Sequence, residues 1–207
     1  MGGRGGPSNM SGGGTNKEAT GAQAFNGVTS DDWFGWATDS EPYQAALNGE
    51  KIPEISQTDG HRYTDEEIAR VKLVAPAIQE AASTSTVSDT TLYRGEMYDS
   101  LLEARRKYKI GATVTNNKLT SYARKQSIAE GYASGSGEDG VKVVISNTSN
   151  KGRSVGVMTD PFGIGGSDEI ISPKGLKSKV KSTRYDSSTN TLYVNMINNA
   201  VPKKRGR

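Results

Sequence analysis

An arginine, a serine and a glutamate in three separated stretches carry the clearest chemical potential of this chain. They are Arg94, in Leu-Tyr-Arg-Gly, Ser121, in Leu-Thr-Ser-Tyr, and Glu169, in Ser-Asp-Glu-Ile-Ile-Ser-Pro-Lys-Gly. A guanidinium pairs with phosphate oxygens through two parallel hydrogen bonds. A carboxylate stabilises positive charge that develops on a sugar ring, provided that neighbouring groups hold it in place. These residue types can bind a phosphate group and stabilise developing positive charge.

The chain offers few other routes to catalysis. It has no cysteine and a single histidine, His61. Cysteine chemistry and metal sites built from several histidines are therefore excluded, and we expect no metal. A Ser-His-Asp triad would depend on His61, which lies in a polar run. Asp168 and Glu169 are neighbours on an expected strand and point to opposite faces, which excludes the paired carboxylates of a glycoside hydrolase.

Two familiar patterns match in the wrong context. Gly135, Gly137 and Gly140 fit G-x-G-x-x-G. Here a helical pattern precedes the glycines and a strand pattern follows, the reverse of the order in a dinucleotide-binding fold, so we expect a loop. Ser178 and Lys181 fit S-x-x-K, but they lie in an alternating strand pattern without the helix that such a nucleophile needs.

Helices are expected in the first half of the chain. Residues 41–49 read as a short helix that Gly49 ends. Thr64 and Glu67 form a capping box, and apolar residues at helical spacing follow it. We expect Pro76 to kink or end this second helix. Further helical patterns occupy two later stretches, 97–108 and 124–133.

Strand patterns dominate the second half. The expected strands are 91–95, 113–122 with an Asn-Asn turn inside it, 141–146, 153–158 and 168–172. Residues 177–185 and 191–197 alternate with period 2 around the turn 186–190, which is typical of a β-hairpin. Helices come first and many strands follow, without regular β-α-β alternation. This order predicts an α+β fold rather than a doubly wound parallel sheet.

Taken in order, these stretches resemble the R-S-E class of mono-ADP-ribosyltransferases, known from bacterial toxins, bacteriophages and animals. Residues 92–95 are similar to the Tyr-Arg-Gly strand of that family. Residues 111–114 and 119–122 are similar to its serine-bearing strand, and residues 128–133 to the helix that follows it. Residues 167–175 are similar to its E-x-E strand. An upstream helix of the family is similar to residues 41–49. The resemblance spans about residues 40–197 and keeps the order of the family.

The resemblance implies both a fold and an activity. The fold would be α+β, with N-terminal helices packed on a mixed, mostly antiparallel β-sandwich core of the ADP-ribosyltransferase type. The activity would be cleavage of the nicotinamide–ribose bond of NAD+, with transfer of ADP-ribose to a macromolecule that we expect to be a host protein. NAD+ would be a substrate, and no metal would take part.

The resemblance also implies roles for individual residues. Arg94, beside Gly95, would hold NAD+ through its diphosphate. Glu169 would bind the ribose 2′-hydroxyl and stabilise the oxocarbenium ion. Ser121, together with Thr120, would orient that glutamate. The NAD+-binding residues would be Arg94, Gly95, Thr120, Ser121, Tyr122 and Arg153.

Two loops, and one position at which the chain differs from the family pattern, bear on the choice of acceptor. The stretch 147–153 falls where the phosphate–nicotinamide loop of the family lies, and Arg153 would contact phosphate there. The stretch 159–167 falls at the target-recognition loop, where Phe162 would be an exposed target contact or, alternatively, a core residue. Ser167 occupies the first position of E-x-E, where arginine-modifying members carry glutamate. A serine cannot act as a carboxylate base, so arginine specificity is open.

Composition predicts one domain with polar ends. Residues 1–30 are rich in Gly, Ser, Thr and Asn without apolar periodicity, and we expect a disordered arm. Residues 31–198 would form the catalytic domain, and 199–207 a basic tail that is solvated or contacts nucleic acid. No stretch approaches the roughly 20 apolar residues of a membrane helix. Residues 1–30 lack the apolar segment of a secretory signal, so we expect none. We expect no membrane association and a cytoplasmic location, in the host cell if the protein is phage-encoded.

Three functions stay open at this point. The first is the transferase, and the second is an NAD+ glycohydrolase that transfers ADP-ribose to water. The third is a non-catalytic binding or virion protein on a degenerate transferase fold, which the Gly-rich arm, the basic tail and Ser167 keep in contention.

Overall fold

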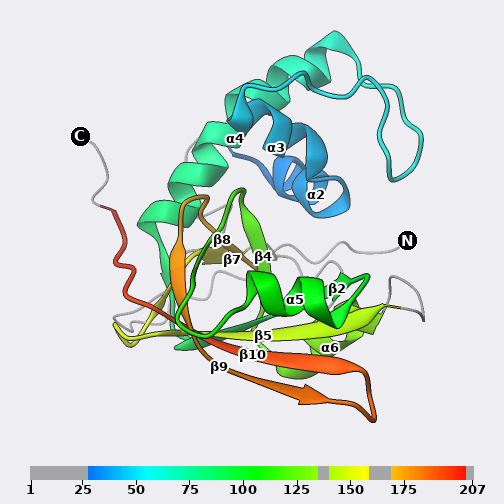
Figure 1. The fold of residues 1–207 in the computed structure, drawn as a ribbon. Helices are drawn as coiled ribbons and strands as arrows, with labels where there is room; N and C mark the ends of the chain where they lie inside the picture. Colours follow the sequence, from blue (N-terminus) through cyan, green and yellow to red (C-terminus); the bar gives the residue numbers. More distant parts are fainter. Residues whose placement is uncertain (1–27, 135–139, 159–168, 204–207) are drawn as a thin grey trace, which may run out of the picture.

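The computed structural model describes residues 28–134, 140–158 and 169–203. Its helices are α2 (Ser30–Thr38), α3 (Glu41–Asn48), α4 (Asp65–Thr84), α5 (Leu101–Lys107) and α6 (Gln126–Ser134). Figure 1 shows α2, α3 and α4 grouped together at one end of the sheet, with α5 and α6 lying along the sheet itself. Across the described ranges, no helix has both the length and the apolar character that crossing a membrane requires.

The described residues also form ten strands. They are β1 (Thr86–Val87), β2 (Thr91–Tyr98), β3 (Thr113–Thr115), β4 (Thr120–Ala123), β5 (Val141–Ser149), β6 (Ser154–Val155), β7 (Val157–Met158), β8 (Glu169–Ser172), β9 (Lys177–Asp186) and β10 (Thr191–Asn198). Eight of them form one sheet in the order β3-β9-β10-β5-β2-β4-β8-β7, while β1 pairs with β6. Within the large sheet, β5 and β10 are parallel and the other pairs are antiparallel. The predicted mixed, mostly antiparallel α+β fold is confirmed.

The helix that begins after Thr64 confirms one prediction and corrects another. The capping box forms, since Thr64 Oγ1 accepts from the Glu67 amide and the Glu67 carboxylate accepts from the Thr64 amide at 2.7 Å. The helix nevertheless continues through Pro76 to Thr84. Of the two expected effects of the proline, a kink or an end, the end is therefore wrong and the kink stays a prediction. Pro76 lies on the exposed side, and buried residues on both sides of it keep the helix packed: Val71, Val74, Ala75, Ile78, Ala81 and Ala82.

The first described helix, α2, has no counterpart among the predicted elements. Thr29 caps it in a capping box with Asp32, and Trp33 and Trp36 on its inner face are buried. Asp32 also accepts hydrogen bonds from the Arg70 guanidinium of α4, which ties the two helices together. The predicted arm, residues 1–30, lies almost entirely outside the described residues, and its boundary stays a prediction.

Other local predictions hold with small shifts. Helix α3 ends at a left-handed Gly49, and β9 and β10 form the predicted antiparallel hairpin. The pattern over 97–108 was expected to be helical throughout, but Met97 and Tyr98 belong to β2. Helix α5 starts only after its cap, Ser100.

The core is divided among the two faces and one end of the sheet. Helices α2, α3 and α4 pack with Leu119, Val157 and Ile171 over the β4-β8-β7 end. Helix α5 packs on β5, β9 and β10. Helix α6 covers β2 and β5 from the other side, with Ala129 and Ala133 fully buried. Because the helices pack on separate parts of the sheet, the seam between β2 and β4 is left for the candidate site.

Candidate functional site

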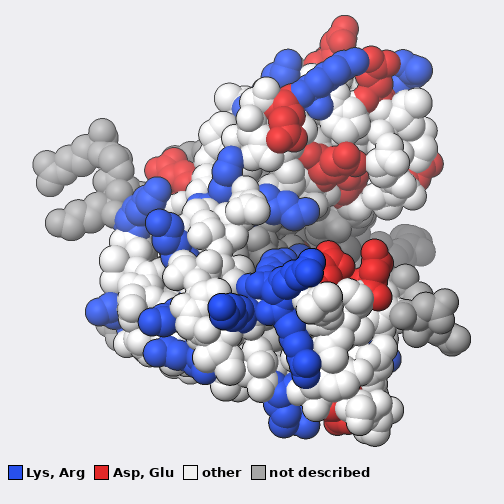
Figure 2. Space-filling model, in the orientation of Figure 1, with Lys and Arg blue, Asp and Glu red and all other residues white. Residues whose placement is uncertain are grey.

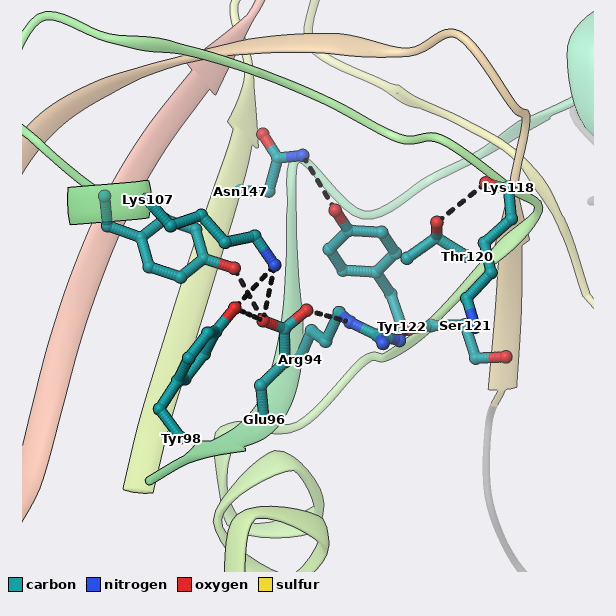
Figure 3. A network of polar contacts seen from close by, with 10 residues as sticks. Arg94, Glu96, Tyr98, Lys107, Lys118, Thr120, Ser121, Tyr122 and Asn147 are labelled. Carbon is teal, nitrogen blue, oxygen red and sulfur yellow. Dashed lines mark hydrogen bonds and ion pairs between the residues drawn. The ribbon is translucent and has the colours of Figure 1, made fainter. Parts of the chain in front are cut away.

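The site lies where the large sheet nearly divides. Strands β2 and β4 share one paired position, Tyr93 with Ala123, whereas β2 pairs with β5 along its whole length. Arg94 follows Tyr93 directly, and its guanidinium spans this seam: Nη1 donates to the Ser121 carbonyl oxygen at 2.9 Å. A side chain therefore makes the connection that a longer β2–β4 ladder would otherwise have made (Figure 3).

A cleft of about 380 Å³ opens at this seam, within the size range of small-molecule sites, roughly 300–1,000 Å³. Its walls come from β2, β4, β8, α6 and one residue of α2: Ala37, Tyr93, Arg94, Gly95, Ser121, Tyr122, Ala123, Ile128, Ala129, Tyr132 and Glu169. The three residues whose chemistry the sequence singled out, Arg94, Ser121 and Glu169, thus line one cleft.

Strand register explains how the glutamate and the serine meet. Ala123 is the Cα partner of both Tyr93 on β2 and Glu169 on β8, so these three residues form one row across the sheet. Ser121 lies two residues from Ala123 and shares its face. Glu169 begins β8 at the mouth of the cleft and is partly exposed.

Gly95 has a clear packing role in addition to lining the cleft. A Cβ at this position would lie 2.0 Å from the Ala129 carbonyl oxygen and 2.6 Å from the Ala133 amide nitrogen. The backbone of α6 therefore rests directly on the strand that carries Arg94. This contact sets the distance between the helix wall of the cleft and its floor.

The flanking residues Thr120 and Tyr122 are both buried. Tyr122 borders the cleft, but its hydroxyl accepts a hydrogen bond from Asn147 in the interior. Thr120 donates to the Lys118 carbonyl oxygen and borders a smaller cavity of about 170 Å³ instead, which Arg94 and Tyr122 also line. Their predicted contact with NAD+ stays a prediction.

The remaining predicted residues lie away from the cleft or outside the described chain. Arg153 is half-buried before β6 and is not part of the cleft wall that the described residues form. Phe162 and Ser167 lie outside the described residues, as do Gly135 and Gly137 of the glycine loop. Lys203 is the last described residue of the tail, and its amide donates to the Ser83 carbonyl oxygen.

Glu96 is a partner of Arg94 that sequence reasoning missed. Its carboxylate accepts from Arg94 Nε at 2.9 Å, and it also accepts from Tyr98, Lys107 and Tyr108. Burial acts to raise the pKa of Glu96, but the hydrogen bond and ion pair with Arg94 and the tyrosine hydrogen bonds lower it to about 2. The available signal was the spacing, because residues two apart on a strand share a face.

Tyr132 is a second residue that was missed. It lies on α6 one helical turn after Ile128, and both residues line the cleft. Tyr132 is 65% exposed, although an aromatic ring of this size gains free energy when it is covered. An exposed aromatic ring in the cleft that Glu169 also lines offers a flat apolar surface to a ligand.

Charge is unevenly distributed over the molecule. Figure 2 shows Lys and Arg gathered over the part of the surface that α5 occupies and beside it, with Asp and Glu more frequent over the N-terminal helices. The exposed basic residues of α5 and β9 are Arg105, Arg106, Lys107, Lys177, Lys179, Lys181 and Arg184. The first turn of α4 contributes acidic residues, Asp65, Glu66 and Glu67. A cationic environment on the α5 side favours anionic ligands.

Structural comparison places the fold. The chain is similar to the Vis toxin, an ADP-ribosyltransferase from Vibrio splendidus, with a TM-score of 0.53 and 14% identity over 83% of this chain and 74% of that one. It is also similar to the ATR domain of Salmonella SpvB, with a TM-score of 0.52 and 17% identity over 80% and 95% of the two chains. This is the ADP-ribosyltransferase fold.

A third similar structure is exoenzyme S from Pseudomonas aeruginosa, in complex with human 14-3-3 protein beta and bound to carba-NAD. Its TM-score is 0.51, with 12% identity over 86% of this chain and 77% of that one. By sequence, the chain matches no protein-family model and no curated protein. At these identities, the likeness to ADP-ribosyltransferases is one of fold.

Proposed function

We propose that the chain is an NAD+-dependent mono-ADP-ribosyltransferase of the R-S-E class, of the bacterial toxin or bacteriophage type. The observation that carries the proposal is the convergence of Arg94, Ser121 and Glu169 on one cleft, in a chain with the ADP-ribosyltransferase fold. The cleft has a cation, a carboxylate and an exposed aromatic ring, which are the groups that a diphosphate, a ribose and a nicotinamide ring each need.

The proposed reaction breaks the bond between ribose C1′ and the nicotinamide nitrogen, and the bonding electron pair leaves with nicotinamide. Arg94 holds the diphosphate, and Glu169 binds the ribose 2′-hydroxyl and stabilises the positive charge that develops at C1′. Ser121 orients Glu169 from the neighbouring strand. A nucleophile of the acceptor then forms the new bond at C1′ and releases a proton.

The acceptor in this proposal is a macromolecule, most simply a host protein, which the enzyme modifies in the host cytoplasm. The Vis structure, which has this fold, is that of a toxin, which supports that setting. A second candidate is NAD+ hydrolysis. Ser167 favours it, because a serine in the first E-x-E position supplies no carboxylate to deprotonate a guanidinium.

The test is to incubate the purified chain with labelled NAD+ and a bacterial lysate, beside the Glu169→Gln variant. Glu130→Gln on α6 is the matched control, since Glu130 bonds Gln126 and does not line the cleft. We expect the parent and the control to transfer label to a macromolecule. We expect Glu169→Gln to retain NAD+ binding. Its turnover number should fall by a factor of about a thousand or more.

Each other result has a defined meaning. Nicotinamide release with label only in free ADP-ribose supports the glycohydrolase instead. NAD+ binding without nicotinamide release supports a non-catalytic protein. Turnover retained in Glu169→Gln removes the assignment of Glu169.

A further inference from the structure

We propose that Glu96 is a positioning residue for NAD+ binding, which holds the Arg94 guanidinium in the orientation that receives the diphosphate. This inference rests on the proposed function and adds a residue to it. Glu96 lies two positions after Arg94 on β2, so the two side chains leave the same face of the strand. Figure 3 shows them side by side, with the Glu96 carboxylate against Arg94.

Two hydrogen bonds fix the guanidinium. Its Nε donates to Glu96 Oε1 at 2.9 Å, and its Nη1 donates to the Ser121 carbonyl oxygen at 2.9 Å. Because the group is planar, bonds from two of its nitrogens determine the orientation of the whole plane. Nη2 has no hydrogen bond to any residue that the structure describes, so its donors are left for a ligand. Arg94 lines the cleft and also two further cavities that it shares with Glu96 and Lys107.

Glu96 is itself held in place from the other side. Its Oε2 accepts from the hydroxyls of Tyr98 and Tyr108, both at 2.7 Å, and from Lys107 Nζ at 3.0 Å. Lys107 ends α5 and Tyr108 follows it directly. Glu96 therefore links α5 to Arg94: Oε1 accepts from Arg94, and Oε2 accepts from Lys107 and Tyr108.

The negative charge of Glu96 makes the inference testable, because its removal should change NAD+ affinity in opposite directions under the two possible roles. Glu96 is ionised at neutral pH, since its pKa is lowered to about 2. A negative charge beside Arg94 repels a diphosphate, so if Glu96 acted only as a counter-charge, its neutralisation would tighten NAD+ binding. If Glu96 positions Arg94, neutralisation weakens binding, because the guanidinium loses its charge-assisted partner and samples other orientations.

The experiment is a double-mutant cycle on NAD+ binding. The Kd of NAD+ is measured by calorimetry for the parent, Glu96→Gln, Arg94→Met and the double variant, each corrected for its folded fraction. The kcat and KM of nicotinamide release are measured in parallel. Glu103→Gln, an exposed carboxylate on α5, is the matched control.

We expect Glu96→Gln to raise Kd and KM about tenfold while kcat stays within about twofold, as for a contact equal in the ground and transition states. In the Arg94→Met background, Glu96→Gln should change Kd by less than about twofold. Glu96→Asp is a second variant, which keeps the charge and shortens the side chain. Positioning predicts weaker binding for it, and a counter-charge role predicts no change.

Tighter NAD+ binding by Glu96→Gln overturns the inference. An equal loss of NAD+ affinity in the parent and the Arg94→Met backgrounds also overturns it, because a purely structural effect is independent of Arg94. Unchanged binding by Glu96→Asp also counts against it. A parent chain that binds no NAD+ overturns the proposed function, and this inference falls with it. If the parent binds NAD+ but the two substitutions change the binding free energy additively, only this inference is overturned.

Discussion

Ser121 and Glu169 share one face of two adjacent antiparallel strands, because Ala123, two residues after Ser121, is the Cα partner of Glu169. Such diagonal neighbours lie roughly 7–8 Å apart at the backbone, within reach of a long side chain. The glutamate can therefore extend along the sheet towards the serine hydroxyl. Both residues belong to strands of the large sheet, so the register between β4 and β8 sets their relative position.

Replacing Ser121 tests this relationship. Loss of a hydrogen bond to a charged group costs about 1.5–3 kcal/mol, so we expect Ser121→Ala to lower kcat for nicotinamide release about tenfold to a hundredfold. Ser127→Ala, at an exposed position of α6, is the control and should retain full activity. An unchanged kcat in Ser121→Ala would show that the serine does not act on Glu169.

Two glycines form a matched pair for the packing of α6. Gly95→Ala would place a methyl group 2.0 Å from a backbone oxygen of the helix, whereas a Cβ at Gly131 meets nothing within 4 Å. We expect Gly95→Ala to lower the free energy of unfolding by about 3 kcal/mol or more. Gly131→Ala should raise it by about 0.5–1 kcal/mol through helix propensity. Urea unfolding measures both, and equal effects would contradict the close approach.

Acid stability should report on Glu96. Its pKa falls from 4.5 to about 2 in the folded chain, so ionised Glu96 stabilises the fold fully above about pH 4.5. This contribution, roughly 3 kcal/mol, is lost as the pH falls towards 2. We expect the difference in unfolding free energy between the parent and Glu96→Gln to shrink across this window. A difference that is constant from pH 7 to pH 2.5 would contradict the lowered pKa.

The exposed ring of Tyr132 should contribute to ligand binding and little to folding. We expect Tyr132→Ala to raise the KM for NAD+ about threefold to tenfold, the range that an aromatic contact of about 0.5–1.5 kcal/mol provides. Its melting temperature should stay close to that of the parent. Leu73→Ala, at a residue that is 69% exposed on α4 and does not line the cleft, is the control. Equal KM values for both variants would exclude Tyr132 from the site.

Much of the local structure was predictable because it depends on residues close together in the chain. The Thr64 capping box, the Gly49 helix end and the β9–β10 hairpin follow from side chains within a few positions of each other. Helix α2 escaped prediction although Thr29 and Asp32 form a capping box, since its two tryptophans are buried against distant residues. Pro76 misled prediction for the same reason, because packing on both sides outweighs the lost backbone hydrogen bond.

The sequence by itself determined the α+β class and the order of three stretches bearing Arg94, Ser121 and Glu169. It also determined which chemistry those residue types suit, because charge and hydrogen-bonding capacity belong to the side chain. Only the tertiary structure decided that the three line one cleft, since strand register depends on contacts between residues far apart in the chain. The same long-range packing decided that Glu96 lies half-buried between Arg94 and α5.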